Sequence, residues 1–206
     1  MPRAWPRHDF PGVQETDMFA ELRTERLTIR DLEVSDAERV FEYRTHPKVS
    51  RFQSWGTQSV EENRNCIRKL SAAKVDVPGP WYQLGITLLS TNELIGDTGF
   101  RMPEAEPRQA EIGITLAPEY QGHGYATETV RGLLDFLLIK RAKHRVFASV
   151  DPANVRSARL MERVGMRREG CFVKTRWFRG EWVDDVIFAM LASEWKSGRG
   201  GGSQRE

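Results

Sequence analysis

The sequence contains few cysteines, no long apolar run and almost no excess of charge. Only two of its 206 residues are cysteines, and Cys66 and Cys171 match no CxxC or Cys/His ligand spacing, which argues against a disulfide framework or a structural zinc. No stretch approaches the roughly 20 apolar residues of a membrane span. Lysine and arginine total 31 against 29 acidic residues, so charge gives no general reason to bind nucleic acid or a membrane surface. We therefore expect a cytoplasmic protein that binds any anion locally.

The chain is long enough for one domain with a substantial core. Residues 1–20 are rich in proline and lack periodicity, and residues 196–206 are rich in glycine and serine. Neither segment has much apolar surface to bury, so we expect an N-terminal arm and a flexible C-terminal tail. The folded domain is expected to span residues 21–195.

The pattern of the folded part predicts an α/β protein. RLTIRD is a first strand, and a serine followed three residues later by glutamate, at Ser35–Glu38 and at Ser59–Glu62, marks the starts of two helices. WYQLGITLL, ELIGDTGFR and QAEIGITLA predict strands of a largely antiparallel sheet. An amphipathic helix at about 126–138, a buried strand in HRVFASV and a helix in VRSARLMERVG follow. Residues 171–191 then predict a hairpin that turns at residues 179–180.

The segment QGHGYAT, residues 121–127, joins the third strand of that series to the long helix. Glycine-rich turns at a helix start bind phosphate, because their backbone N–H groups point outward beside the positive end of the helix dipole. A P-loop needs Lys and Ser/Thr after its last glycine, and a dinucleotide fingerprint needs a third glycine where Thr127 stands, so both fit badly. The segment resembles instead the pyrophosphate loop of the GNAT acetyltransferases, Gln/Arg-x-x-Gly-x-Gly/Ala, with Gln121, Gly124 and Ala126 at its fixed positions.

Other segments resemble the same family. IGITLAPEYQGHGYATETVRGLLDF is similar to its central segment, and DPANVRSARLMERVGMRREG to the next. LRTERLTIRDLEVSDAERVFEY and GEWVDDVIFAMLASEW resemble the branch that includes the RimJ/RimL-type ribosomal-protein N-terminal acetyltransferases. The resemblance implies a mixed, mostly antiparallel sheet of about seven strands flanked by helices. Its fourth and fifth strands, at about 109–117 and 144–150, splay apart, and their unpaired backbone groups pair with the pantetheine arm of acetyl-CoA.

The resemblance also implies where acetyl-CoA is held. Backbone N–H groups of residues 122–126 bind the pyrophosphate, with the two glycines allowing close approach and positive φ. His123 has no catalytic role in this scheme. The residues expected to bind the cofactor are Ile114, Leu116, Gln121, Gly122, His123, Gly124, Tyr125, Ala126, Thr127, Asn154 and Arg159.

Asn154 opens the helix after the fifth strand. Its side-chain oxygen is expected to cap that helix, which leaves the NH₂ group free to bond pantetheine. Arg156, Arg159 and Arg163 share one side of the same helix. They meet either the 3′-phosphate of CoA or solvent.

Glu111 is the candidate general base. It alternates out of phase with the apolar residues of IGITL, and if its face lines the cleft it deprotonates the attacking amine through water. An amine must be neutral to attack, whereas α-amino groups and lysines are mostly protonated at pH 7. The alternative is a surface glutamate paired with Arg108 or Arg101.

The general acid is less evident. Many GNAT enzymes protonate the departing thiolate with a tyrosine seven residues beyond the helix-opening Asn, and here that position is Met161. Ser157 matches the serine proposed for this role in the RimL-type branch, and its alternative role is a helix-surface hydroxyl. Expelling a thiolate at pH 7 without an acid costs at most about 2 kcal/mol. We therefore expect direct transfer in a ternary complex, with no metal and no covalent acyl-enzyme.

The acceptor pocket is expected to include Arg51 and Trp55 in RFQSWG, and Trp177 and Asp184 in WFRGEWVDD. Aromatic walls with a carboxylate suit a cationic amine, although Trp182 is expected in the core. A protein N-terminal amine, as on a ribosomal protein, is favoured over an aminoglycoside, polyamine or amino acid. The alternative to an enzyme is a non-catalytic regulatory module that binds acyl-CoA. A monomer and a homodimer are both compatible with the sequence.

Overall fold

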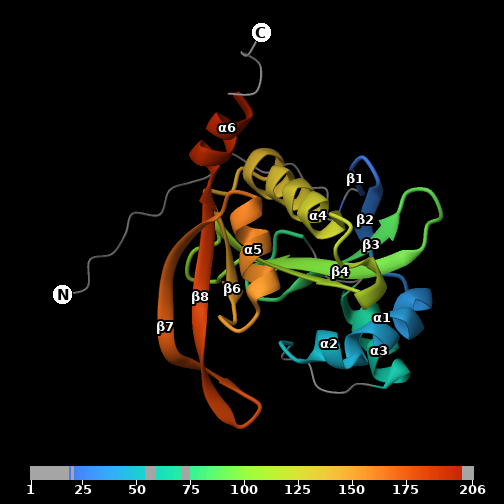
Figure 1. Cartoon of the computed structure of the whole chain (residues 1–206). Helices are drawn as coiled ribbons and strands as arrows, with labels where there is room; N and C mark the ends of the chain where they lie inside the picture. The colour runs from blue at the N-terminus through green and yellow to red at the C-terminus, as the bar shows by residue number, and fades with distance from the viewer. Residues whose placement is uncertain (1–18, 20, 54–58, 71–74, 201–206) are drawn as a thin grey trace.

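The computed structural model describes residues 19, 21–53, 59–70 and 75–200 (Figure 1). The strands are β1 (Leu22–Arg23), β2 (Leu27–Asp31), β3 (Tyr82–Leu88), β4 (Leu94–Arg101), β5 (Gln109–Leu116), β6 (Arg145–Val150), β7 (Arg167–Phe178) and β8 (Glu181–Leu191). The helices are α1 (Ala37–Thr45), α2 (Pro47–Ser50), α3 (Val60–Leu70), α4 (Tyr125–Leu134), α5 (Val155–Arg163) and α6 (Ala192–Gly200). Short helical turns are η1 (Val34–Asp36) and η2 (Pro118–Tyr120), and η3 (Asp135–Lys140) continues α4 as a π-helix.

The strands form an eight-stranded sheet in the order β1-β2-β3-β4-β5-β6-β8-β7. The β5–β6 pair is parallel and the other neighbouring pairs are antiparallel. The mixed, mostly antiparallel α/β sheet that the sequence predicts is therefore confirmed. It has one strand more than the expected seven, and the strands expected as fourth and fifth are β5 and β6.

Helices cover both faces of the sheet. The apolar sides of α4 and α5 pack on one face, over inward-facing residues of β5, β6 and β8. The opposite face carries α1 and α3, whose apolar residues form a second cluster with Leu94 of β4. The β7–β8 hairpin extends beyond the rest of the sheet (Figure 1). Its turn lies at residues 179–180, as the sequence predicts.

Both helices predicted after the first strand are present as α1 and α3, and one of the two predicted capping boxes is confirmed. The N–H of Ser59 donates to the Glu62 carboxylate (2.6 Å) and the N–H of Glu62 donates to the Ser59 hydroxyl (3.1 Å). The capping box predicted at Ser35 and Glu38 is wrong. The 3₁₀ turn η1 precedes α1, and the side chain of Asp36 accepts the backbone N–H at the start of that turn.

Both ends of the folded part differ from the sequence-based boundaries. Phe19, expected in the N-terminal arm, is buried against Tyr82 and Phe136, with ring centroids 6.1 and 4.9 Å away. At the other end, α6 continues past residue 196 to Gly200, into the segment expected to be a tail. Among the described residues, no helix is long and apolar enough to cross a bilayer.

Candidate active site

The strands β5 and β6 are paired at one end and separated at the other. Their parallel ladder joins residues 109–111 to residues 145–147. In contrast, β4 stays paired with β5 as far as Leu116, and β8 with β6 as far as Val150. The two central strands therefore diverge beyond Glu111, which leaves the gap that the family resemblance implies.

Backbone groups of β5 face this gap. The N–H of Ala117 donates to the carbonyl of Ile95 on the β4 side (2.9 Å). In an antiparallel strand, every second residue points its N–H and C=O groups toward the same neighbouring strand. Ala117 points toward β4, so Ile114 and Leu116 point their N–H and C=O groups toward β6. The carbonyl of Leu116 accepts from Nε2 of Gln121 (3.0 Å). The backbone of Ile114 has no strand partner on that side within the described chain, so it is available to an extended, amide-rich ligand.

The loop between β5 and α4 lies at the open end of the gap. Gly122 and Gly124 have φ values of +88° and +84°, the left-handed conformation that glycine adopts without strain. A Cβ at Gly122 would meet nothing within 4 Å, and one at Gly124 would meet only Nη2 of Arg26, at 3.3 Å. The loop surface is thus bare, and the first N–H groups of α4 have no helical acceptor. Such a surface suits a phosphate group.

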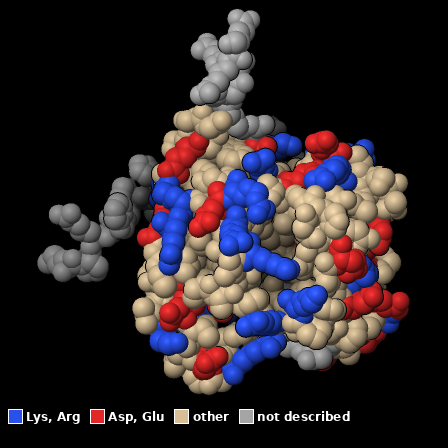
Figure 2. Space-filling view, viewed as in Figure 1, with Lys and Arg blue, Asp and Glu red and all other residues tan. Residues whose placement is uncertain are grey.

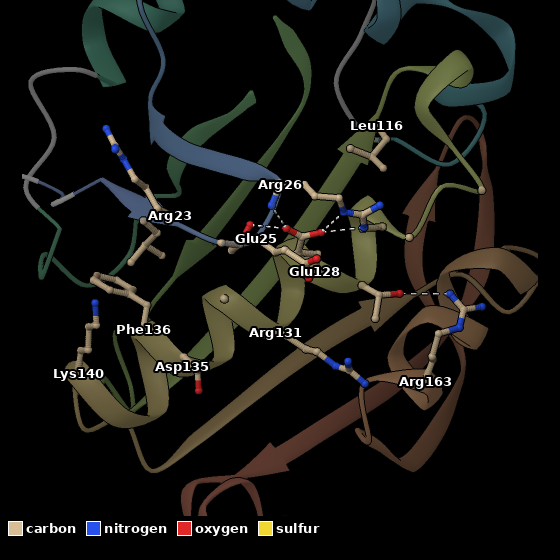
Figure 3. Close-up of a pocket in the computed structure, with 17 residues that line it drawn as sticks. Arg23, Glu25, Arg26, Leu116, Glu128, Arg131, Asp135, Phe136, Lys140 and Arg163 are labelled. Atoms are coloured by element: carbon tan, nitrogen blue, oxygen red, sulfur yellow. Dashed lines mark hydrogen bonds and ion pairs between the residues drawn. The ribbon is translucent and has the colours of Figure 1, made fainter. Parts of the chain in front are cut away.

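A pocket of about 890 Å³ adjoins this loop (Figure 3). It is lined by residues of the loop, of β1 and the turn after it, of α4 and η3, and by one residue each of β5 and α5. Its basic lining residues are Arg23, Arg26, Arg131, Lys140 and Arg163, against the acidic residues Glu25, Glu128 and Asp135. The excess of cations favours an anionic occupant.

The arginines of α5 face the loop. Arg156 donates to Oε1 of Gln121 (3.0 Å), and Arg163 donates to the Thr127 hydroxyl (3.3 Å). Arg159 lies between them on the same side of the helix. Figure 2 shows lysine and arginine side chains gathered over this part of the molecule. Gln121 therefore links the end of β5 to α5 across the mouth of the gap.

Asn154 caps α5 as predicted. Its Oδ1 accepts the N–H of Ser157 (3.2 Å), and its NH₂ group donates to no protein atom in the described chain. The hydroxyl of Ser157 is likewise without a protein partner there, and the residue is half-buried. Met161 is 2% exposed and belongs to the core under α5. Asn154 and Ser157 thus present free polar groups beside the β6 edge of the gap.

Glu111 lies where β5 and β6 come together, on the face opposite α4. It is 9% exposed, and its Oε2 accepts from Nε and Nη2 of Arg101 (2.7 and 2.6 Å). Of the two arginines that the sequence offers as ion-pair partners of Glu111, Arg101 therefore forms the pair. Arg108 bonds Glu106 instead. Among the described residues, Oε1 of Glu111 has no hydrogen-bond partner.

Arg51 lies at the C-terminal end of α2, exposed, with its guanidinium over the ring of Phe52 (5.1 Å to the centroid). Trp55 lies outside the described residues. The tip of the β7–β8 hairpin reaches this helix, because Arg179 donates to the carbonyl of Ser50 (2.8 Å). The hairpin that carries Trp177 and Asp184 is thus in contact with the helix that ends beside Arg51.

Trp177 and Asp184 lie on opposite strands of that hairpin. Trp177 packs edge-on against Trp182, with centroids 5.4 Å apart. The two rings are 59% and 52% exposed, so the expected place of Trp182 in the core is wrong. Asp184 accepts the backbone N–H of Lys174 (3.0 Å). The hairpin therefore exposes two aromatic rings near a carboxylate.

Two residues on the loop side were not singled out from the sequence. Nε of Arg26 donates to Oε2 of Glu128 (2.8 Å), and Oε1 of Glu128 accepts from the Thr24 hydroxyl (2.6 Å). Burial opposes ionisation of Glu128, but the bonds from Thr24 and Arg26 outweigh it and lower the pKa of the carboxyl. The partners are 102 residues apart, so no local pattern in the sequence pointed to the pair.

Residues 26–167 match the family model described as an acetyltransferase (GNAT) domain. The chain belongs to the GNAT acetyltransferases. It is therefore an N-acetyltransferase with acetyl-CoA as donor. The uncharacterized N-acetyltransferase YnaD of Bacillus subtilis is 31% identical over 174 residues, which cover 84% of this chain and 98% of that protein.

Two further comparisons with GNAT proteins extend over most of the chain. The crystal structure of a GNAT-family acetyltransferase from Bacillus anthracis is 33% identical, with a TM-score of 0.77 over 85% of this chain and 100% of its own. The ribosomal protein uS5-alanine N-acetyltransferase of Escherichia coli is 24% identical over 195 residues, 91% of this chain and 99% of that enzyme. The predicted family is confirmed, with ribosomal-protein acetyltransferases among the relatives.

Proposed function

We propose that this GNAT enzyme acetylates the α-amine of a protein N-terminus, held in the gap between β5 and β6. The observation that carries the proposal is the divergence of these strands beyond residues 109–111 and 145–147, with a bare glycine loop at the open end. Similarity to the uS5-alanine N-acetyltransferase over 91% of the chain supports the class of acceptor. A ribosomal-protein N-terminus is the acceptor that we favour.

In this proposal the donor enters from the loop. Its pyrophosphate accepts from backbone N–H groups of residues 122–126, where Gly122 and Gly124 present no side chain. The pantetheine arm runs along β5 past Ile114, whose outward backbone groups meet its amides, and Asn154 bonds it with the free NH₂ group. Arg159, beside two arginines that already face the loop, meets the 3′-phosphate. The thioester then lies toward the closed end of the gap, near Glu111.

The reaction at that end is a direct transfer. The neutral amine nitrogen attacks the thioester carbonyl carbon, the C–N bond forms, and the C–S bond breaks as the sulfur departs as thiolate. The amine gives up one proton through water to Glu111, whose Oε1 is available. Backbone N–H groups of β5 stabilise the developing oxyanion, and the hydroxyl of Ser157 donates to the departing thiolate.

The acceptor approaches from the other side of the gap, between α2 and the β7–β8 hairpin. Arg51 supplies one wall, and Trp177 with Asp184 supplies the other. The exposed ring of Trp177 attracts a cationic amine through its π face, and the carboxylate of Asp184 adds charge complementarity.

Replacing Glu111 with glutamine is expected to lower turnover about 100-fold at pH 7, within the range typical of a lost general base. The activity of the variant should recover as pH rises, because a growing fraction of the amine is then already neutral. The measurement is the pH dependence of kcat for wild type and variant. Glu106→Gln is the matched control, since Glu106 also pairs with an arginine but is away from the gap. A pH profile identical to that of wild type would remove Glu111 as base.

A panel of acceptors tests the proposed function itself. Peptides that begin with alanine or serine, free lysine, polyamines and an aminoglycoside are each incubated with acetyl-CoA, and released thiol is measured. We expect the N-terminal peptides to be acetylated and the same peptides with a blocked α-amine to be inert. Turnover of small amines alone would assign a small-molecule enzyme. Tight acetyl-CoA binding with no turnover of any amine would contradict the catalytic proposal in favour of a regulatory module.

A further inference from the structure

Arg26 contacts three consecutive residues of the loop that the proposed function assigns to pyrophosphate. Its Nη1 donates to the carbonyl of His123 (3.1 Å). Its guanidinium lies over the ring of Tyr125, 4.6 Å from the centroid. Between them, Nη2 is 3.3 Å from the position that a Cβ of Gly124 would occupy. The side chain therefore packs against the turn where its backbone has the left-handed conformation.

Arg26 is itself held by α4. Oε2 of Glu128 accepts from its Nε (2.8 Å), and Oε1 accepts from its backbone N–H (2.7 Å) and from the hydroxyl of Thr24 (2.6 Å). Figure 3 shows Arg26 and Glu128 facing one another across the upper end of the pocket. One carboxylate thus fixes both the backbone and the side chain of Arg26, and the planar guanidinium carries that constraint to the loop.

The bond to His123 determines which way the next amide points. In a trans peptide the C=O of one residue and the N–H of the next point in opposite directions. Because the His123 carbonyl points at Arg26, the N–H of Gly124 points away from it. That N–H is among those that the proposed function assigns to pyrophosphate. The charge of Arg26 is already balanced by Glu128, so its contribution to binding is geometric.

We propose that Arg26 is a positioning residue for the donor, and that with Thr24 and Glu128 it holds the loop in the conformation that binds pyrophosphate. This inference rests on the proposed location of acetyl-CoA. It assigns a role in catalysis to a β1–β2 turn that contacts neither the thioester nor the acceptor. Arg26 acts only through the loop, so replacing it should weaken only the contacts that the loop makes with the pyrophosphate of the donor.

The test compares two donors, acetyl-CoA and S-acetyl-pantetheine, which lacks the pyrophosphate. For Arg26→Gln we expect kcat/KM with acetyl-CoA to fall about 10- to 100-fold, as misplaced binding groups typically cause, mainly through KM. Activity with S-acetyl-pantetheine should stay within twofold. Arg64→Gln is the matched control, because Arg64 of α3 also pairs with a glutamate of another helix, Glu38 of α1, but does not line the pocket. An equal loss with both donors would overturn the inference, because it would indicate a general structural role.

Calorimetric titration with CoA gives a readout that needs no acceptor. Arg26→Gln should bind CoA at least tenfold more weakly than wild type, and Glu128→Gln should weaken binding in the same direction. Arg26→Lys keeps the charge but not the two-sided contact, so it should recover only part of the affinity. Full recovery with lysine, or unchanged affinity in Arg26→Gln, would overturn the inference while the proposed function stands. Absence of CoA binding by the wild type would instead refute the proposed function.

Discussion

Replacing Gly124 with valine is expected to abolish measurable acetyl-CoA binding while the protein stays folded. Gly124 has φ +84° and ψ −7°, a left-handed conformation that costs an ordinary L-residue about 1–2 kcal/mol and a β-branched one more. The loop of the variant is expected to relieve that strain by rotating the peptides on either side. The N–H groups proposed to bind pyrophosphate then no longer converge. Binding is measured by calorimetry and folding by the melting temperature.

Gly180→Val is the matched control for this substitution. Gly180 also has a positive φ, +87°, and a Cβ there would meet nothing within 4 Å. Its place at the tip of the β7–β8 hairpin is far along the chain from the loop. The control should carry a similar backbone strain but bind acetyl-CoA like the wild type. If Gly124→Val retained its affinity for acetyl-CoA while the two variants had similar melting temperatures, the loop would be excluded as the pyrophosphate site.

Replacing Asp97 with asparagine is expected to destabilise the protein by about 3–5 kcal/mol, the cost typical of breaking a buried ion pair. Asp97 is 1% exposed in β4. Its carboxylate accepts from the Tyr43 hydroxyl (2.6 Å), from Nε and Nη2 of Arg44 (3.1 and 2.9 Å) and from Nε2 of Gln83 (2.5 Å). Burial first, and then the Asp97 charge, raise the pKa of Tyr43 well above its usual value, so the hydroxyl stays a donor.

The same network holds α1 against the sheet. Tyr43 and Arg44 belong to α1, so the carboxylate of Asp97 anchors that helix to the sheet beside Thr115, its register partner in β5. Glu42→Gln is the control, because Glu42 also forms an ion pair on α1 but is 69% exposed at its side chain, and such pairs contribute at most about 1 kcal/mol. Free energies of unfolding come from urea titrations. Equal losses in the two variants would mean that the buried network contributes no more than a surface pair.

The fold and the loop were predictable where local chemistry decides them. Glycines at 122 and 124 permit positive φ without strain, and Ser59 with Glu62 specifies a helix start within one turn of chain. The Ser35 box fails for a reason that is also local: the side chain of Asp36 accepts the N–H of Glu33, which closes a 3₁₀ turn just before α1. Alternation placed Glu111 opposite the apolar face of β5, but it did not decide between Arg101 and Arg108 as the ion-pair partner.

Interactions between distant segments were not predictable from one sequence. Glu128 is bonded to Arg26 across 102 residues, and Asp97 is bonded to Tyr43 across 54. No periodicity relates such partners, since each pairing depends on how whole elements pack. The exposure of Trp182 has the same origin, because the hairpin extends past the sheet and leaves no core around that ring. Family resemblance located the cofactor loop and its strands, but it did not show what holds them in place.

The most direct test of the account is a crystal structure of the protein with CoA bound. We predict that the pyrophosphate lies against the backbone N–H groups of residues 122–126 and that pantetheine runs between β5 and β6. Its amides should pair with the backbone of Ile114 and its sulfur should lie toward Glu111. CoA bound outside this gap, or a pyrophosphate held by side chains remote from Gly122 and Gly124, would contradict the account.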